Sequence, residues 1–148
     1  MPNIVFNNAL GRVAYLASLP AANDALIAVP IETAGIVSDA IMRDYHDLQT
    51  LLAGASNEQA TMGRKSLTGV TVTIDDAADR VAVDSADIVW TGATGNPISA
   101  LVICYVPDST APSDATTIPL CKHDFVIVPD GSDVAATVAD FYRATSAA

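Results

Sequence analysis

From residue 65 onward, apolar and polar residues alternate in short runs that turn residues separate. Val70, Val72 and Ile74 alternate with threonines, a pattern typical of a strand with one buried face. The run 98–105 (ISALVICY) is the most apolar in the chain and predicts a central strand. Because no helical pattern separates these runs, they favour antiparallel pairing. We therefore expect a mainly β fold, an antiparallel β-sandwich or barrel-like domain, with one short α-helix near the N-terminus.

The other strands and turns of this region are predicted in the same way. Turn residues such as Pro129, Asp130 and Gly131 mark where the chain reverses. Further strands are expected at 80–84, 87–91, 118–121, 124–128 and 134–138, and turns at 75–79, 92–97 and 129–132.

The expected helix runs from Tyr45 to Ala53. Asp44 is a suitable N-cap, and Gly54 suits the left-handed position that follows a helix. Earlier in the chain, Ala25 to Ile31 is an apolar run that predicts a buried strand, with Pro30 placing its end at a sheet edge. The apolar side chains of residues 7–18 have only a rough helical spacing.

We expect a single β-rich domain over residues 1–148. In this interpretation residues 1–64 form an N-terminal arm and helix region that packs on a β core of residues 65–148. A chain of this length can bury a substantial core.

The composition favours contact with other chains. Hydrophobic residues make up 51% of the sequence and charged residues only 16%, yet the net charge is −10. Charged side chains normally supply much of the polar cover of a small domain. We therefore expect neutral surface to be buried against other copies or other proteins, as in a component of an assembly.

The charge is unevenly distributed. Residues 1–65 hold six acidic and four basic residues, whereas residues 66–148 hold 11 acidic and three basic residues. Phosphate binding depends on clustered Lys and Arg, so we expect no nucleic-acid partner. No apolar run approaches the roughly 20 residues that cross a bilayer, so we expect no membrane partner either.

The cysteine and histidine residues form no recognisable catalytic or metal motif. Cys121 and His123 are two residues apart and share a strand face, and Cys104 lies opposite or one pair away if the flanking strands form a hairpin. The two cysteines are therefore either small core residues or a cross-strand disulfide. Zinc needs further ligands at a recognisable spacing. His46, on the expected helix, and His123, between strands, are interpreted as having a structural or solvent role and not a catalytic one.

Other candidate sites also have ordinary structural explanations. Trp90 is interpreted as a core residue, with burial in an interface as the alternative. An acidic cluster lacks the spacing of a calcium loop, and its members are typical turn aspartates. We expect no enzyme activity, no catalytic residue, no metal and no cofactor. The cluster consists of Asp75, Asp76, Asp79, Asp84 and Asp87.

Several segments together resemble small virion proteins of tailed bacteriophages, of the capsid decoration or cement type. The segments are FNNALGRVAYLASLP, RDYHDLQTLLAG, DIVWTGATGNPISALVICYVPDST and IPLCKHDFVIVPDGSDVAATV, and together they cover nearly the whole chain. The resemblance implies a β-rich domain that binds the outside of the capsid and bridges neighbouring major capsid proteins. It also implies a homo-oligomer, a trimer rather than a dimer, that is made in the host bacterial cytoplasm and resides on the capsid exterior.

The less negative charge of residues 1–65 suggests which residues face the capsid. We expect Arg12, Arg43, Arg64 and Lys65 to contact an acidic capsid surface. Three alternatives stay open. They are a fibre or surface module that recognises a host glycan, a head-completion or tail protein, and an enzyme that uses Cys104, Cys121 and His123.

Overall fold

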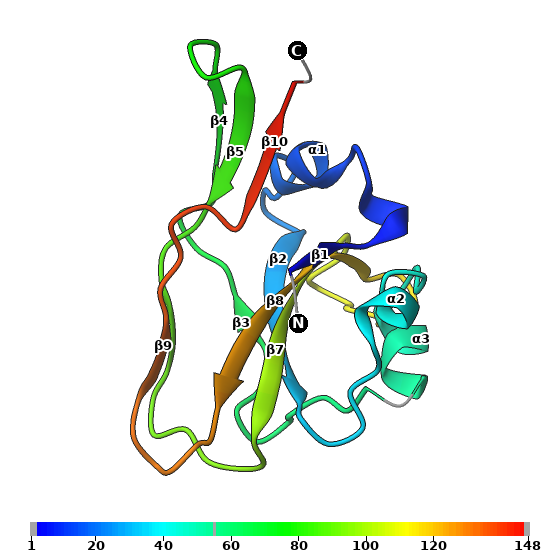
Figure 1. Ribbon diagram of the computed structural model, residues 1–148, viewed down its shortest axis with the longest axis vertical. Helices are drawn as coiled ribbons and strands as arrows, with labels where there is room; N and C mark the ends of the chain where they lie inside the picture. The colour runs from blue at the N-terminus through cyan, green and yellow to red at the C-terminus, as the bar shows by residue number, and fades with distance from the viewer. Residues whose placement is uncertain (1–2, 55, 147–148) are drawn as a thin grey trace.

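The structure is a computed structural model that describes residues 3–54 and 56–146. It is mainly β, with antiparallel sheets arranged in a sandwich-like fold, as the alternating pattern predicted. A central sheet has α2 and α3 on one side and the β9 ribbon on the other (Figure 1). Three short α-helices are present among the described residues, where one was expected.

The central sheet has five strands in the order β1-β8-β7-β2-β3. The middle strand, β7, is buried along almost its whole length, which confirms the prediction that this apolar run is central. Its continuous hydrophobic character follows from having strands on both edges and side chains covering both faces. The strands are β1 (Ile4–Val5), β2 (Ala25–Glu32), β3 (Lys65–Ser66), β7 (Ile98–Val106) and β8 (Ile118–Ile127).

Strand β8 is one strand where the sequence indicated two. The apparent break falls at Lys122 and His123, which interrupt the apolar pattern. Lys122 nevertheless lies inside the sheet, opposite Ile4 on one side and Val102 on the other. Its side chain is fully buried because two aspartates bind its ammonium group there.

Two smaller sheets complete the β structure, with orders β10-β5-β4 and β6-β9. The prediction that β4 has one buried face is only partly met, because Ile74 is 76% exposed. Strand β4 is the outer strand of a hairpin that extends away from the main body (Figure 1), so little packs over its end. The strands are β4 (Thr71–Asp75), β5 (Arg80–Asp84), β6 (Ile88–Trp90), β9 (Val134–Ala136) and β10 (Tyr142–Thr145).

The expected helix starts three residues later than predicted. Helix α3 begins at Leu48, and Asp47 is its N-cap, accepting a hydrogen bond from Thr50 N at 2.8 Å. The predicted cap, Asp44, instead accepts a hydrogen bond from Asn7 Nδ2 at 2.7 Å. His46 therefore precedes the helix and is exposed. The helices are η1 (Asn7–Ala9, a 3₁₀ turn), α1 (Val13–Ala17), α2 (Asp39–Met42) and α3 (Leu48–Ala53).

The first 64 residues contribute directly to the central sheet, since β1 and β2 are two of its strands. The two halves of the chain therefore share one sheet. Pro30 lies within β2 and not at its end, and its carbonyl accepts a hydrogen bond from Gln59 N at 2.9 Å. Strand β3 pairs only with Ile27 and Ala28, so no regular strand needs the N–H group that Pro30 lacks.

Candidate interaction surface

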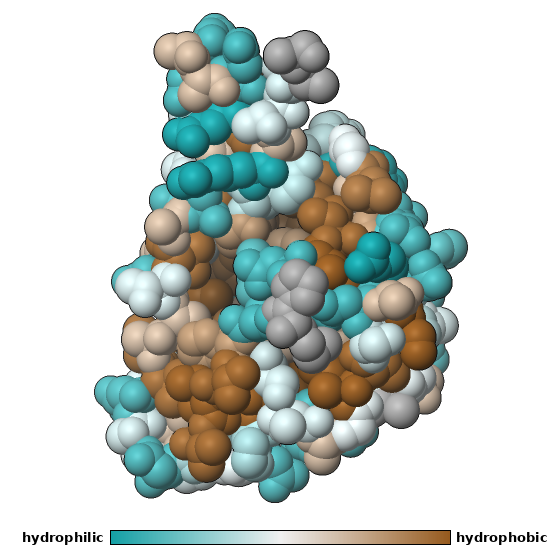
Figure 2. Space-filling model, in the orientation of Figure 1, coloured by the Kyte–Doolittle hydropathy of each residue, from teal (hydrophilic) through white to brown (hydrophobic). Residues whose placement is uncertain are grey.

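Seven large hydrophobic side chains are exposed among the described residues. Single exposed apolar residues are common on any protein, so their grouping is the informative observation. Figure 2 shows brown areas over the α1 and α2 side of the molecule and a further cluster at the end of β8. The seven residues are Leu10, Tyr15, Ile41, Ile74, Val89, Val126 and Val128.

The exposed side chains near α1 and α2 follow from the way that these short helices pack. Helix α1 turns Val13, Leu16 and Ala17 towards the core at helical spacing, which leaves Tyr15 outward and 64% exposed. Helix α2 buries Met42 and leaves Ile41 53% exposed. The apolar residues on both helices therefore divide between the core and the solvent.

The segment before α1 contacts the end of α2, because the N–H of Asn7 in η1 donates to Arg43 O at 2.8 Å. Arg12 lies between Leu10 and Tyr15 in the chain, and Arg43 follows α2 directly. Two predicted capsid-contact residues thus lie on or directly beside the short helices and turns that carry three exposed hydrophobic residues. We call this group the helical surface, and it consists of Leu10, Arg12, Tyr15, Ile41 and Arg43.

Both arginines of the helical surface keep their charge available. Arg12 donates to the backbone oxygen of Asn8 at 2.8 Å, and Arg43 donates to Asp39 O at 3.2 Å. Neither makes an ion pair within residues 3–54 and 56–146. Each guanidinium is exposed and held by an uncharged carbonyl, so it can pair with a carboxylate of another protein.

Arg64 differs from these two arginines. It binds Glu58 and Asp114, each with its closest N–O distance at 2.6 Å, and its side chain is 31% exposed. The hydrogen bonds that Arg64 donates to Glu58, and then to Asp114, raise the pKa of Arg64, and the contact with Arg64 lowers the pKa of Asp114. The charge of Arg64 is thus satisfied inside the protein. Lys65 is half-buried on β3, so the structure separates the four predicted contact residues into two pairs.

The second apolar cluster lies at the end of β8, and we call it the β8 end. Val126 is 75% exposed and Val128 is 70% exposed. Their two-residue spacing places them on the same side of an extended chain. In Figure 2 a brown area lies over the lower end of β8, apart from the brown areas near α1 and α2.

The two cysteines are buried free thiols, so the core interpretation is confirmed and the disulfide alternative is wrong. Cys121 pairs with Ile103, which places Cys104 one pair away, as the hairpin predicted. The Sγ atom of Cys121 lies 3.3 Å from His123 Nε2. Burial raises the pKa of Cys121 to about 12, so its thiol is protonated at neutral pH and is a poor nucleophile.

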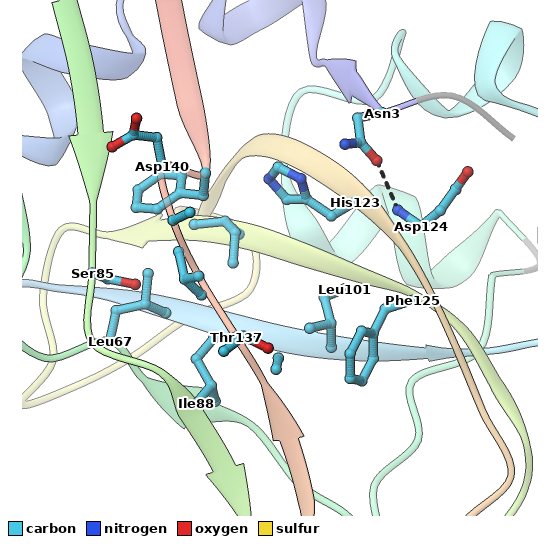
Figure 3. Close-up of a pocket in the computed structure, with 15 residues that line it drawn as sticks. Asn3, Leu67, Ser85, Ile88, Leu101, His123, Asp124, Phe125, Thr137 and Asp140 are labelled. Atoms are coloured by element: carbon cyan, nitrogen blue, oxygen red, sulfur yellow. Dashed lines mark hydrogen bonds between the residues drawn. The ribbon is translucent and has the colours of Figure 1, made fainter.

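A cavity of about 220 Å³ lies between the central sheet and the β6–β9 layer. Figure 3 shows Leu101, Phe125 and His123 lining it from the sheet, with Thr137 on the facing segment. Burial, and then the charge of Lys122, lower the pKa of His123. The volume is below the roughly 300 Å³ at which ordinary ligand pockets begin.

The acidic cluster forms turn and loop contacts. Asp75 Oδ1 accepts from Ala78 N at 3.1 Å, Asp84 from Ser85 N, and Asp87 from Val138 N. No group of three metal-binding side chains occurs in the part of the chain that the structure describes. Trp90 is 2% exposed and its Nε1 donates to Gly63 O at 2.9 Å, which confirms the core interpretation.

Sequence reasoning missed two buried polar groups. Lys122 binds Asp39 and Asp124, and Gln59 is 1% exposed with its side-chain amide fully hydrogen-bonded. A lysine inside an otherwise apolar run was the available signal for the first group. Nothing in the sequence around Gln59 marks it, because its partners lie on distant loops.

Comparison with protein-family models, with curated proteins and with solved structures finds no match. No described helix has the length and apolar character needed to cross a membrane.

Proposed function

We propose that this protein is a structural component of a tailed-bacteriophage virion that binds the outer surface of the capsid and cements neighbouring major capsid proteins. The helical surface is the observation that carries this proposal. It combines three exposed hydrophobic side chains with two arginines that make no ion pair within the described residues. Apolar and aromatic anchors beside Arg are typical of protein interfaces.

A decoration protein stabilises a capsid because it binds the assembled lattice and not the separated subunits. Burying a large side chain such as Leu10 or Ile41 contributes about 1.5–3 kcal/mol, so one copy provides modest affinity. An oligomer that contacts several capsid subunits at once gains effective concentration. Weak single contacts can therefore hold a lattice together.

The β8 end supplies a separate surface for contact between copies. Val126 and Val128 lie on and just after β8 and not on α1, α2 or the turns beside them, so self-association through them leaves the capsid-binding residues accessible. We propose a homotrimer in preference to a dimer, located on the capsid exterior. Light scattering on the purified protein measures this directly, and Val126→Ser with Val128→Ser should shift the mass towards the monomer.

The test of capsid binding compares matched variants. Replacing Leu10 and Ile41 with Ser should weaken the affinity for purified heads at least about a hundredfold, since each lost side chain removes about 1.5 kcal/mol or more and 1.4 kcal/mol is tenfold. Ile74→Ser is the control, because Ile74 is a large apolar residue at least as exposed as Leu10 and Ile41 but lies on the β4 hairpin. Equal loss in the control, or unchanged occupancy in the double variant, rejects the helical surface as the contact.

A second comparison tests the charges. Arg12→Glu with Arg43→Glu should weaken binding more at low salt than at high salt, since exposed charges are screened. Arg143→Glu is the control, because that residue lies on β10 and is 54% exposed. Absence of the chain from purified virions by mass spectrometry contradicts the proposed function itself. Heads without the protein should also release DNA at a lower temperature.

A further inference from the structure

The side chains of Lys122, Asp39 and Asp124 form a buried cluster between the central sheet and α2. Lys122 Nζ lies 2.8 Å from Asp39 Oδ1 and 2.7 Å from Asp124 Oδ1. The Lys122 side chain is 0% exposed, that of Asp39 11% and that of Asp124 30%. Asp39 comes from α2, 83 residues away in the chain from Lys122 on β8.

A cluster that holds two elements together by charge alone carries a large desolvation cost. Removing an ammonium and a carboxylate from water costs several kcal/mol for each ion, and apolar residues of similar size are often as stabilising. The chain nevertheless places a nucleophilic nitrogen in contact with a carboxyl group, with a second carboxylate on the same nitrogen. An amine and a carboxyl group are the reactants of amide formation, and the second carboxylate is placed where it can carry the proton.

We propose that Lys122 and Asp39 form an intramolecular isopeptide bond, with Asp124 carrying the proton. A proton first moves from Lys122 Nζ to Asp39 across their hydrogen bond, which gives a neutral amine and a neutral carboxylic acid. No proton enters from outside.

The amine lone pair then attacks Asp39 Cγ and a C–N bond forms. Asp124 accepts a proton from the nitrogen and returns it to the departing hydroxyl of Asp39, so the C–O bond breaks and one water leaves. No oxidant, reductant or cofactor takes part. Held in contact, the two groups react at effective concentrations on the order of 10⁵ M or more, which replaces external activation of the acid.

Asp39 is the favoured acyl group and Asp124 the favoured proton carrier because their environments differ. Asp39 is the more buried of the two carboxyl groups, and it comes from a different element than Lys122. Asp124 is 30% exposed and contacts the same nitrogen, so it can take up the proton and return it without becoming the acyl group. The resulting bond ties α2, which carries Ile41 of the helical surface, to the central sheet. The inference holds whether or not the protein binds a capsid.

Intact-mass spectrometry of the purified full chain tests the bond. The protein should weigh one water molecule less than its sequence, compared with Lys122→Arg, which shares its termini but cannot react. The Asp124→Asn variant keeps both reacting groups and should have the full mass while retaining native circular dichroism. A wild-type protein of full mass overturns the proposal, whatever the variants do.

Peptide mapping locates the lost water. Trypsin cannot cut after a modified lysine, so the link joins residues 13–43 to an uncut peptide of residues 81–143. A cyclic imide at Asp130-Gly131 also loses water, but it stays within residues 123–143. Water loss confined to that peptide, or a link from Lys122 to Asp124, contradicts the proposal.

Discussion

Replacing Gln59 with Leu should destabilise the protein strongly although the side chains are similar in size. Its Nε2 donates to Thr94 O at 3.0 Å and to Asn96 O at 3.1 Å, and its Oε1 accepts from Thr61 N at 2.8 Å and from Met62 N at 3.1 Å. The substitution leaves two carbonyls and two N–H groups without these partners. The side chain thus fixes the 92–97 turn against the 56–64 segment.

The magnitude follows from those four hydrogen bonds. Each contributes about 1 kcal/mol net, and burial of the added apolar surface returns about 1 kcal/mol, so the free energy of unfolding should fall by about 3 kcal/mol. For a domain of this size the melting temperature should fall by about 6–12 °C. Such a loss is a large part of the roughly 5–15 kcal/mol that stabilises a typical protein.

Urea unfolding followed by Trp90 fluorescence and by circular dichroism measures this loss. Trp90 is the single tryptophan, and its Nε1 donates to Gly63 O beside the Gln59 segment. Gln49→Leu is the matched control, because Gln49 is exposed on α3 and Leu has a similar helix propensity. The control should change stability by no more than about 0.5 kcal/mol. A loss below about 1 kcal/mol for Gln59→Leu, or equal losses in both variants, refutes the reasoning.

Three further predictions concern the turn, the acid response and the thiols. Gly95→Ala should lower the free energy of unfolding in urea more than Gly131→Ala does. Both glycines have positive φ, but only at Gly95 would the added Cβ meet the Gln59 amide. Equal losses of stability would mean that this contact is unimportant. The pKa of Asp114 is lowered by its hydrogen bond with Arg64, so its stabilising contribution is present above about pH 3.9 and is lost as the pH falls below that value. Melting temperatures of Arg64→Met should therefore fall less steeply than wild type in that window, and parallel curves would argue against it. Cys121 should react with a thiol reagent only after unfolding, because burial raises its pKa to about 12. Rapid reaction of the native protein would contradict this burial.

The sequence predicted the β structure well because strand alternation is a local signal. Residues 98–105 and 80–84 were placed correctly since their side chains meet the layers that their pattern indicates. The start of α3 was predicted less well because two aspartates compete for the cap. Asn7 binds Asp44 from 37 residues away, and this tertiary contact was not visible in the local pattern.

The candidate site was harder to predict because it depends on long-range contacts. The composition suggested exposed apolar surface, but only the packing of α1 and α2 selects Tyr15 and Ile41. Arg64 was expected to contact a partner, whereas Asp114, 50 residues further along, occupies its guanidinium. Charge asymmetry therefore indicated a plausible half of the chain and not which arginines are available.

The pairing of β1 with β8 has a consequence for biosynthesis. Ile4 lies opposite Lys122, and Ala25 at the start of β2 lies opposite Val106 on β7. A ribosome must therefore release most of the polypeptide before the earliest segments find their neighbours. Until then the apolar β2 segment stays exposed to solvent. Because its partners are distant in the sequence, folding should be slow and largely post-translational. Nascent chains should therefore depend on chaperones that bind unfolded segments.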